Sequence, residues 1–122
     1  MVEQYIKEYI KDLKYSYNYL YDISEKLKSK ASNLLYVIKA TKYFGVNEIV
    51  IDTRKALSDK HITDQIHHMR MIYKSGIASL KYYKTQLKPD SDINKDLDVF
   101  IKKAQTELDD LENLYKEIKK IL

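Results

Sequence analysis

The sequence has no cysteine and no tryptophan, and its 122 residues include one proline and two glycines. Without cysteine, disulfides and thiolate metal sites are excluded, which is typical of proteins in a reducing compartment. Because sheet proteins need many turn residues, so little glycine and proline favours helices. We therefore expect an all-α protein with a cytoplasmic location.

Long apolar runs are also missing. The first fourteen residues (MVEQYIKEYIKDLK) carry charges every few positions, where a secretory signal needs a continuous apolar stretch. No later segment approaches the roughly 20 apolar residues of a membrane span. We expect neither a signal peptide nor a membrane span, and the length suits a single helical-bundle domain over residues 1–122.

The apolar residues are spaced alternately three and four apart in three segments, which places one apolar stripe on one helix face. In the first segment the stripe is Ile6, Ile10, Leu13, Tyr17, Leu20, Ser24, Leu27 and Ala31. In the third it is Ile62, Ile66, Met69, Tyr73, Gly76, Leu80, Tyr83 and Leu87. In the last it is Ile93, Leu97, Phe100, Ala104, Leu108, Leu111, Tyr115, Ile118 and Leu122.

The second segment, about residues 33–57, has two apolar phases that meet at Gly45. We expect a second helix that is kinked or broken at Gly45. A short extended piece over residues 46–52 (VNEIVID) is the alternative, because that stretch is rich in β-branched residues. Residues 14–23 (KYSYNYLYDI) also alternate like a strand, but the helical stripe continues on both sides of them, so we predict helix there.

Turns near residues 31–33, 58–60 and 88–91 divide the chain into four segments of similar length. Short connections make neighbouring helices antiparallel, so the pattern predicts an up-down-up-down antiparallel four-helix bundle. Pro89 ends the third helix, and Asp90 or Ser91 is suited to cap the last one.

Tyrosine is unusually common, with twelve residues against two phenylalanines. We predict that four tyrosines belong to the core: Tyr17, Tyr73, Tyr83 and Tyr115. On a helical wheel, four other apolar side chains point nearly opposite the stripes: Tyr15, Tyr19, Met71 and Tyr82. Outward aromatic and methionine side chains are typical of interaction surfaces. The first hypothesis is therefore a non-enzymatic interaction protein that forms a homo-oligomer or docks a protein partner through these four residues.

The basic excess, +4 overall, gives a second hypothesis. Lysines and tyrosines interleave at Lys39, Lys42 and Tyr43, and again at residues 81–84. Lysine contacts phosphate and tyrosine stacks on unpaired bases. With only two arginines, Arg54 and Arg70, specific base readout is not indicated. The alternative function is a small basic helical subunit that binds RNA or single-stranded DNA weakly and nonspecifically.

An enzyme ranks third. His61, Asp64 and His68 fall within about 60° of one another on a helix, and two imidazoles with a carboxylate are a ligand set for zinc or another divalent ion. An aspartate in a helix's first turn is also explained by the helix dipole. Glu-x-x-His, HExxH, nucleophile-elbow and Gly-rich phosphate motifs are absent from the sequence, and we expect no cofactor.

Arg54 followed by His61 gives an R-x6-H spacing that resembles the signature of the HEPN ribonuclease and toxin superfamily, whose domains are also helical bundles. The resemblance implies that Arg54 would hold a phosphate and that His61 would assist proton transfer. It covers two residues. In that family the pair usually opens the last helix, whereas here it spans the turn before the third helix. The family also has a recognisable polar residue directly after the arginine, and this sequence has Lys55 at that position instead.

Overall fold

The computed structural model describes residues 2–44, 47–58 and 62–121. Within these residues the chain forms four α-helices and no strand: α1 (Val2–Phe44), α2 (Asn47–Ser58), α3 (Ile62–Thr85) and α4 (Asp92–Ile121). The all-α prediction is confirmed, and the alternating residues 14–23 are helical. The extended alternative is wrong from Asn47 onward, because those residues begin α2. None of the described helices has the length and apolar character that a membrane crossing requires.

Helix α1 is much longer than predicted, with 43 residues or about 65 Å. The turn expected near residues 31–33 is wrong. Leu27, Ala31, Leu35 and Ile38 are all buried at helical spacing, so one stripe continues through the predicted turn. The helix ends at Phe44 and α2 begins at Asn47, on either side of Gly45, which lies outside the described residues.

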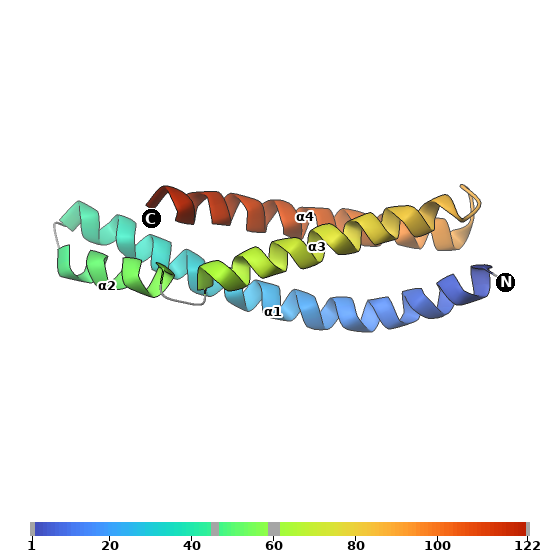
Figure 1. Cartoon of the computed structure of the whole chain (residues 1–122), viewed down its shortest axis with the longest axis horizontal. Coiled ribbons are helices and arrows are strands. Elements are labelled where there is room, and N and C mark those ends of the chain that lie inside the picture. The colour runs from blue at the N-terminus through green and yellow to red at the C-terminus, as the bar shows by residue number, and fades with distance from the viewer. Residues whose placement is uncertain (1, 45–46, 59–61, 122) are drawn as a thin grey trace.

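The helices form an elongated bundle in which α2 and α3 follow one another in the same direction, antiparallel to α1 (Figure 1). Helix α4 returns antiparallel to α3. The four helices have 43, 12, 24 and 30 residues, so they are not the four similar segments that were expected. The up-down-up-down four-helix bundle is therefore not confirmed by the described helices.

The predicted stripes form the core. Among the described side chains, those with no more than 1% exposure include apolar residues from all four helices: Ala31, Ile38, Leu57, Ile66, Leu97, Leu111 and Ile118. Tyr73 is buried as predicted, whereas Tyr17, Tyr83 and Tyr115 are half-buried at the edges of the core. The core has two clusters of buried residues, one that includes Ile66 and Leu111 and one that includes Leu80 and Leu97. Tyr17 packs against both clusters and contacts the rings of Tyr73 and Phe100. The apolar stripes therefore place most of the core as predicted, but three of the four predicted core tyrosines lie at its edges.

The start of α4 follows the predicted capping chemistry. The Ser91 hydroxyl accepts a hydrogen bond from the Asn94 backbone N–H at 3.2 Å. This bond satisfies one of the N–H groups that have no partner within a helix's first turn. Ser91, rather than Asp90, is therefore the N-cap residue.

Gly76 was predicted to lie on the apolar stripe of α3, but it is exposed. Its neighbour Ile77 is the buried residue at this point of the helix, so the stripe contains Ile77 and not Gly76. A Cβ at position 76 would meet no heavy atom within 4 Å. We expect Gly76→Ala to raise the free energy of unfolding by about 0.5–1 kcal/mol, because alanine loses less backbone entropy in a helix.

Urea denaturation followed by circular dichroism measures this change. Ala78→Gly, at another exposed position of α3, is the matched control and should lower the free energy of unfolding by a similar amount. A less stable Gly76→Ala protein would contradict the open surroundings of position 76.

Candidate functional site

The four side chains predicted to form an interaction surface are all exposed. The exposed fractions are 83% for Tyr15, 70% for Tyr19, 48% for Met71 and 63% for Tyr82. Tyr15 and Tyr19 lie one turn apart on α1, whereas Met71 and Tyr82 lie eleven residues apart on α3, or about 16 Å along its axis. The exposure agrees with the helical wheel, and the interaction role stays a prediction.

Tyr82 belongs to an aromatic group between the start of α1 and the end of α3. Its ring lies 5.9 Å from that of Tyr83, which lies 4.9 Å from that of Tyr9. Both separations are within the range of favourable aromatic pairs. Tyr5, one turn before Tyr9, is 72% exposed. The α1–α3 edge therefore presents aromatic surface to solvent at this end of the bundle.

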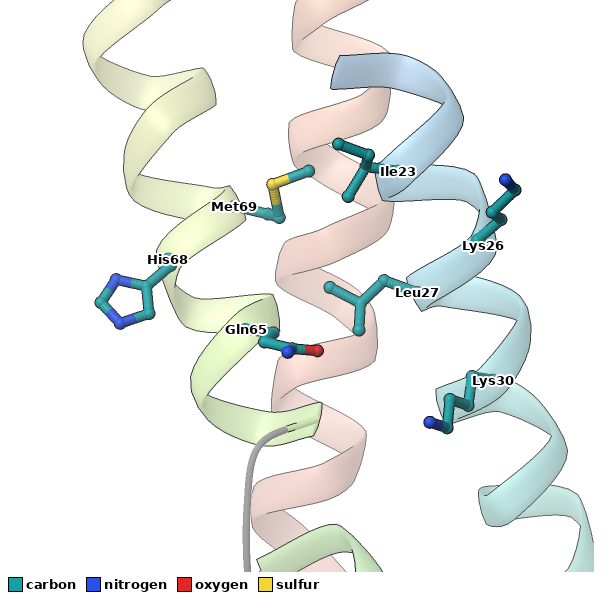
Figure 2. Close-up of a pocket in the computed structure, with 7 residues that line it drawn as sticks. All are labelled: Ile23, Lys26, Leu27, Lys30, Gln65, His68 and Met69. Atoms are coloured by element: carbon teal, nitrogen blue, oxygen red, sulfur yellow. The ribbon is translucent and has the colours of Figure 1, made fainter. Parts of the chain in front are cut away.

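Further along the same two helices lies a shallow groove of about 400 Å³ (Figure 2). Ile23 and Leu27 of α1 and Met69 of α3 point into the space between the helices. Its remaining lining residues are polar or charged: Lys26, Lys30, Gln65 and His68. The groove therefore has an apolar floor and a mostly basic rim.

Two exposed aliphatic residues, one lining this groove and one near it on α3, were not predicted from the sequence. Ile23 of α1 is 43% exposed and Ile72 of α3, one turn from His68, is 49% exposed. Both flank a predicted stripe rather than lie opposite to it. The sequence did contain a signal, because apolar residues also occur on the edges of the two stripes. The spacing does not show which edge of a stripe a neighbouring helix covers.

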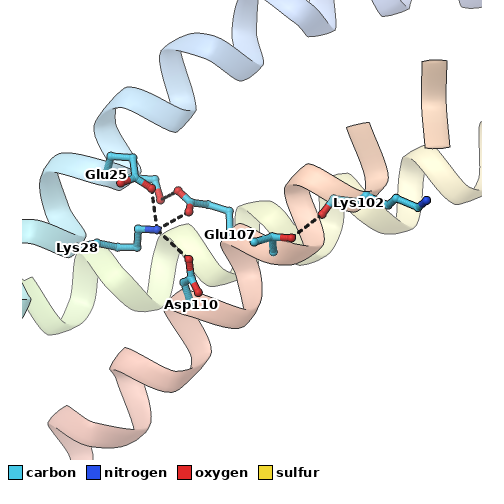
Figure 3. Close-up of polar contacts among 7 residues, drawn as sticks. Glu25, Lys28, Lys102, Glu107 and Asp110 are labelled. Carbon is cyan, nitrogen blue, oxygen red and sulfur yellow. Dashed lines mark hydrogen bonds and ion pairs between the residues drawn. The ribbon is translucent and has the colours of Figure 1, made fainter. Parts of the chain in front are cut away.

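A second feature is a cluster of charged side chains between α1 and α4, centred on the buried Glu107 (Figure 3). Glu107 is 3% exposed on α4, and Ser24 of α1 donates a hydrogen bond to its Oε2 at 3.0 Å. The Lys28 ammonium pairs with Glu107, with Glu25 at 2.7 Å and with Asp110 at 3.2 Å. The cluster therefore joins α1 to α4 through one ammonium and three carboxylates.

The environment of this cluster keeps Lys28 charged. Burial raises the pKa of Glu107, while hydrogen bonds from Lys28 and Ser24 oppose that rise. Burial lowers the pKa of Lys28, but its hydrogen bonds to the three carboxylates outweigh this effect and raise it. The hydrogen bond from Lys28 lowers the pKa of Glu25. Because this ammonium is protonated and fully engaged, it is not a nucleophile or a base.

The sequence carried two signals of this cluster. Ser24 was the polar interruption in the first stripe, and Glu107 stood beside Ala104, Leu108 and Leu111 in the last. A cleft of about 430 Å³ opens beside the cluster between α1 and α4. Its three carboxylates already contact Lys28, so the chemistry of this region is that of a structural ion-pair network.

The predicted metal set is not assembled in the part of the chain that the structure describes. Asp64 and His68 are exposed on α3, and His61 lies outside the described residues. Within the described ranges, no group of three or more histidine, aspartate or glutamate side chains has a metal-binding arrangement. The metal site therefore stays a prediction that depends on His61.

The HEPN-like pair also depends on His61. Arg54 lies in α2 and is half-buried, and its Nε has no hydrogen-bond partner among the described atoms. Since the partner histidine is not described, the distance between the two side chains is not tested, and the ribonuclease role stays a prediction.

Two lysines of the predicted nucleic-acid surface are engaged in ion pairs. Lys84 pairs with Asp98, and Lys39 lies 3.7 Å from Glu117. The side chains of Lys42 and Tyr43 lie outside those that the structure describes. Acidic residues of α4 thus partly neutralise the positive charge that phosphate binding would need.

Comparison with known protein families, curated proteins and solved structures gives no match for this chain.

Proposed function

We propose that this chain is a non-enzymatic interaction protein, which self-associates or binds a protein partner through exposed apolar side chains of α1 and α3. The observation that carries the proposal is the exposure of Tyr15 and Tyr19, 83% and 70%, on one side of α1. Tyrosine is enriched in protein interfaces because its ring buries a large area while its hydroxyl stays hydrated.

The groove beside these tyrosines supports the same function. Ile23, Leu27 and Met69 offer an apolar centre, and Lys26 and Lys30 offer a charged rim. An apolar centre with a polar rim is the usual anatomy of a protein interface. The proposal also includes a cytoplasmic location, which the lack of cysteine favours.

We expect the purified protein to form a salt-resistant dimer or larger species, because apolar contacts are little affected by salt. Tyr19→Ser should raise its dissociation constant about tenfold or more, since buried tyrosines often carry much of an interface's binding energy. Light scattering at low and high salt measures the mass. Tyr36→Ser is the matched control, because Tyr36 is 73% exposed elsewhere on α1. Equal effects of the two substitutions would sink the proposal for this surface.

The second candidate function is weak, nonspecific binding of RNA or single-stranded DNA, which the exposed Tyr82 beside exposed Lys81 favours. Absorbance at 260 and 280 nm on the light-scattering peak separates the two functions. Nucleic acid that is bound at low salt and lost at high salt would support the second candidate, because lysine–phosphate contacts weaken steeply with salt.

A further inference from the structure

Between Glu8 and Lys30, the charged residues of one narrow arc of α1, centred on Tyr19, are sorted by sign along the helix. With about 100° per residue, seven of the side chains between Glu8 and Lys30 fall within one arc of about 80°. In chain order they are Glu8, Asp12, Tyr15, Tyr19, Ile23, Lys26 and Lys30. We call this arc the α1 face: its acidic residues come first, its apolar residues lie in the middle, and its basic residues come last.

The α1 face is available for binding. All seven of its side chains are exposed. None of the ion pairs among the described residues includes Glu8, Asp12, Lys26 or Lys30. By contrast, Lys28, which lies on the other side of the helix, contacts three carboxylates of its own chain. The charges of the α1 face are thus left without ion-pair partners within the described part of the chain.

This order of charges is self-complementary when two copies of α1 lie antiparallel. A two-fold axis through Tyr19 places Glu8 opposite Lys30 of the other copy and Asp12 opposite Lys26. The same axis places Tyr15 opposite Ile23, and Tyr19 opposite its own equivalent. Each off-axis contact occurs twice in such a symmetric interface, giving four ion pairs around an apolar centre. A parallel pairing would instead place like charges opposite each other.

We infer that the partner of this surface is a second copy of the chain, bound through an antiparallel contact between the two α1 faces. The inference rests on the proposed function and names its partner. From Glu8 to Lys30 the contact is about 33 Å long. Three residues of the α1 face, Ile23, Lys26 and Lys30, also line the α1–α3 groove, so the second α1 covers one side of that groove. For a contact along a single helix we expect a weak dimer, with a dissociation constant on the order of micromolar.

Two charge variants test the pairing. The acidic variant carries Lys26→Glu with Lys30→Glu, and the basic variant carries Glu8→Lys with Asp12→Lys. Each should raise the dissociation constant of its own dimer at least about tenfold, because like charges then face each other. An equimolar mixture should form a heterodimer, since every acidic position then faces a basic one. Sedimentation equilibrium with one variant fluorescently labelled measures both results.

The matched control is Lys95→Glu with Lys102→Glu, on the exposed side of α4, which changes the net charge by the same amount as the acidic variant. It should dimerise like the original protein. A protein that carries all four substitutions of the α1 face should also dimerise, because the pairing is then restored with its signs exchanged. Circular dichroism checks that each variant is folded.

The outcomes separate this inference from the proposed function. If the original protein dimerises and Tyr19→Ser dissociates it, but the charge variants dimerise normally, the antiparallel pairing is overturned while the surface stands. A protein that is monomeric at 100-fold the expected dissociation constant, about 100 µM, overturns a second copy as the partner. Weakening by the α4 control also overturns the inference, because net charge would then explain the effect.

Discussion

Replacing Lys28 by methionine is expected to lower the free energy of unfolding by about 3 kcal/mol at neutral pH. Glu107 is 3% exposed and would lose its ammonium partner, keeping only the hydrogen bond from Ser24. A buried carboxylate without its cation must either remain charged in an apolar surrounding or take up a proton, and both cost free energy. Urea denaturation followed by circular dichroism measures the loss.

Two further variants identify the cause of this loss. Lys26→Met changes an exposed lysine on the same helix and should alter the free energy of unfolding by less than about 0.5 kcal/mol. Lys28→Met combined with Glu107→Leu should recover most of the stability, because apolar residues often replace a buried ion pair without cost. A double variant as unstable as Lys28→Met would contradict the assignment to an unpaired Glu107.

The effect of Lys28→Met should also depend on pH. Burial raises the pKa of Glu107 already in the original protein, and removing Lys28 removes an interaction that lowers it. A carboxyl whose pKa is higher folded than unfolded favours folding below the unfolded value, and this contribution is lost as pH rises through the folded value. The stability difference between Lys28→Met and the double variant, which lacks Glu107, should therefore shrink as the pH falls from 7 toward 4.

Asn33→Pro is expected to lower the free energy of unfolding by about 3 kcal/mol or more. Position 33 lies inside α1, where proline removes a backbone hydrogen bond and clashes with the carbonyl of Ser29, one turn earlier. Ala31 and Leu35, on either side, are buried against the rest of the bundle, so a kink would displace core contacts.

The control for this substitution is Asn33→Ala. Asn33 is exposed, so alanine should leave stability unchanged or raise it by up to about 0.5 kcal/mol, in line with its higher helix propensity. Urea denaturation of both variants gives the comparison. A proline variant that is as stable as the alanine variant would mean that residues 31–33 form a turn, as the sequence suggested, and not a continuous helix.

The sequence by itself determined the all-α class and most of the buried helix faces. Ile66, Leu97 and Leu111 are buried where the three-four spacing placed them, and Tyr15 and Tyr19 are exposed where it placed them opposite. Ser91 also caps α4, and it was one of the two residues that the sequence offered for this role. These features are predictable because helix hydrogen bonds and caps join residues a few positions apart, and the apolar period is set by the same local geometry.

Only the tertiary structure decided where α1 ends. It also decided which edges of the apolar stripes are covered by neighbouring helices. Residues 31–33 favour a turn locally, but Ala31, Leu35 and Ile38 gain burial against other helices when α1 continues. Glu107 is buried because Lys28, 79 residues earlier, reaches it across the bundle, while Ile23 remains partly exposed beside the groove. Burial and ion pairing depend on the neighbours that folding brings together, and the spacing of residues along one helix does not specify those neighbours.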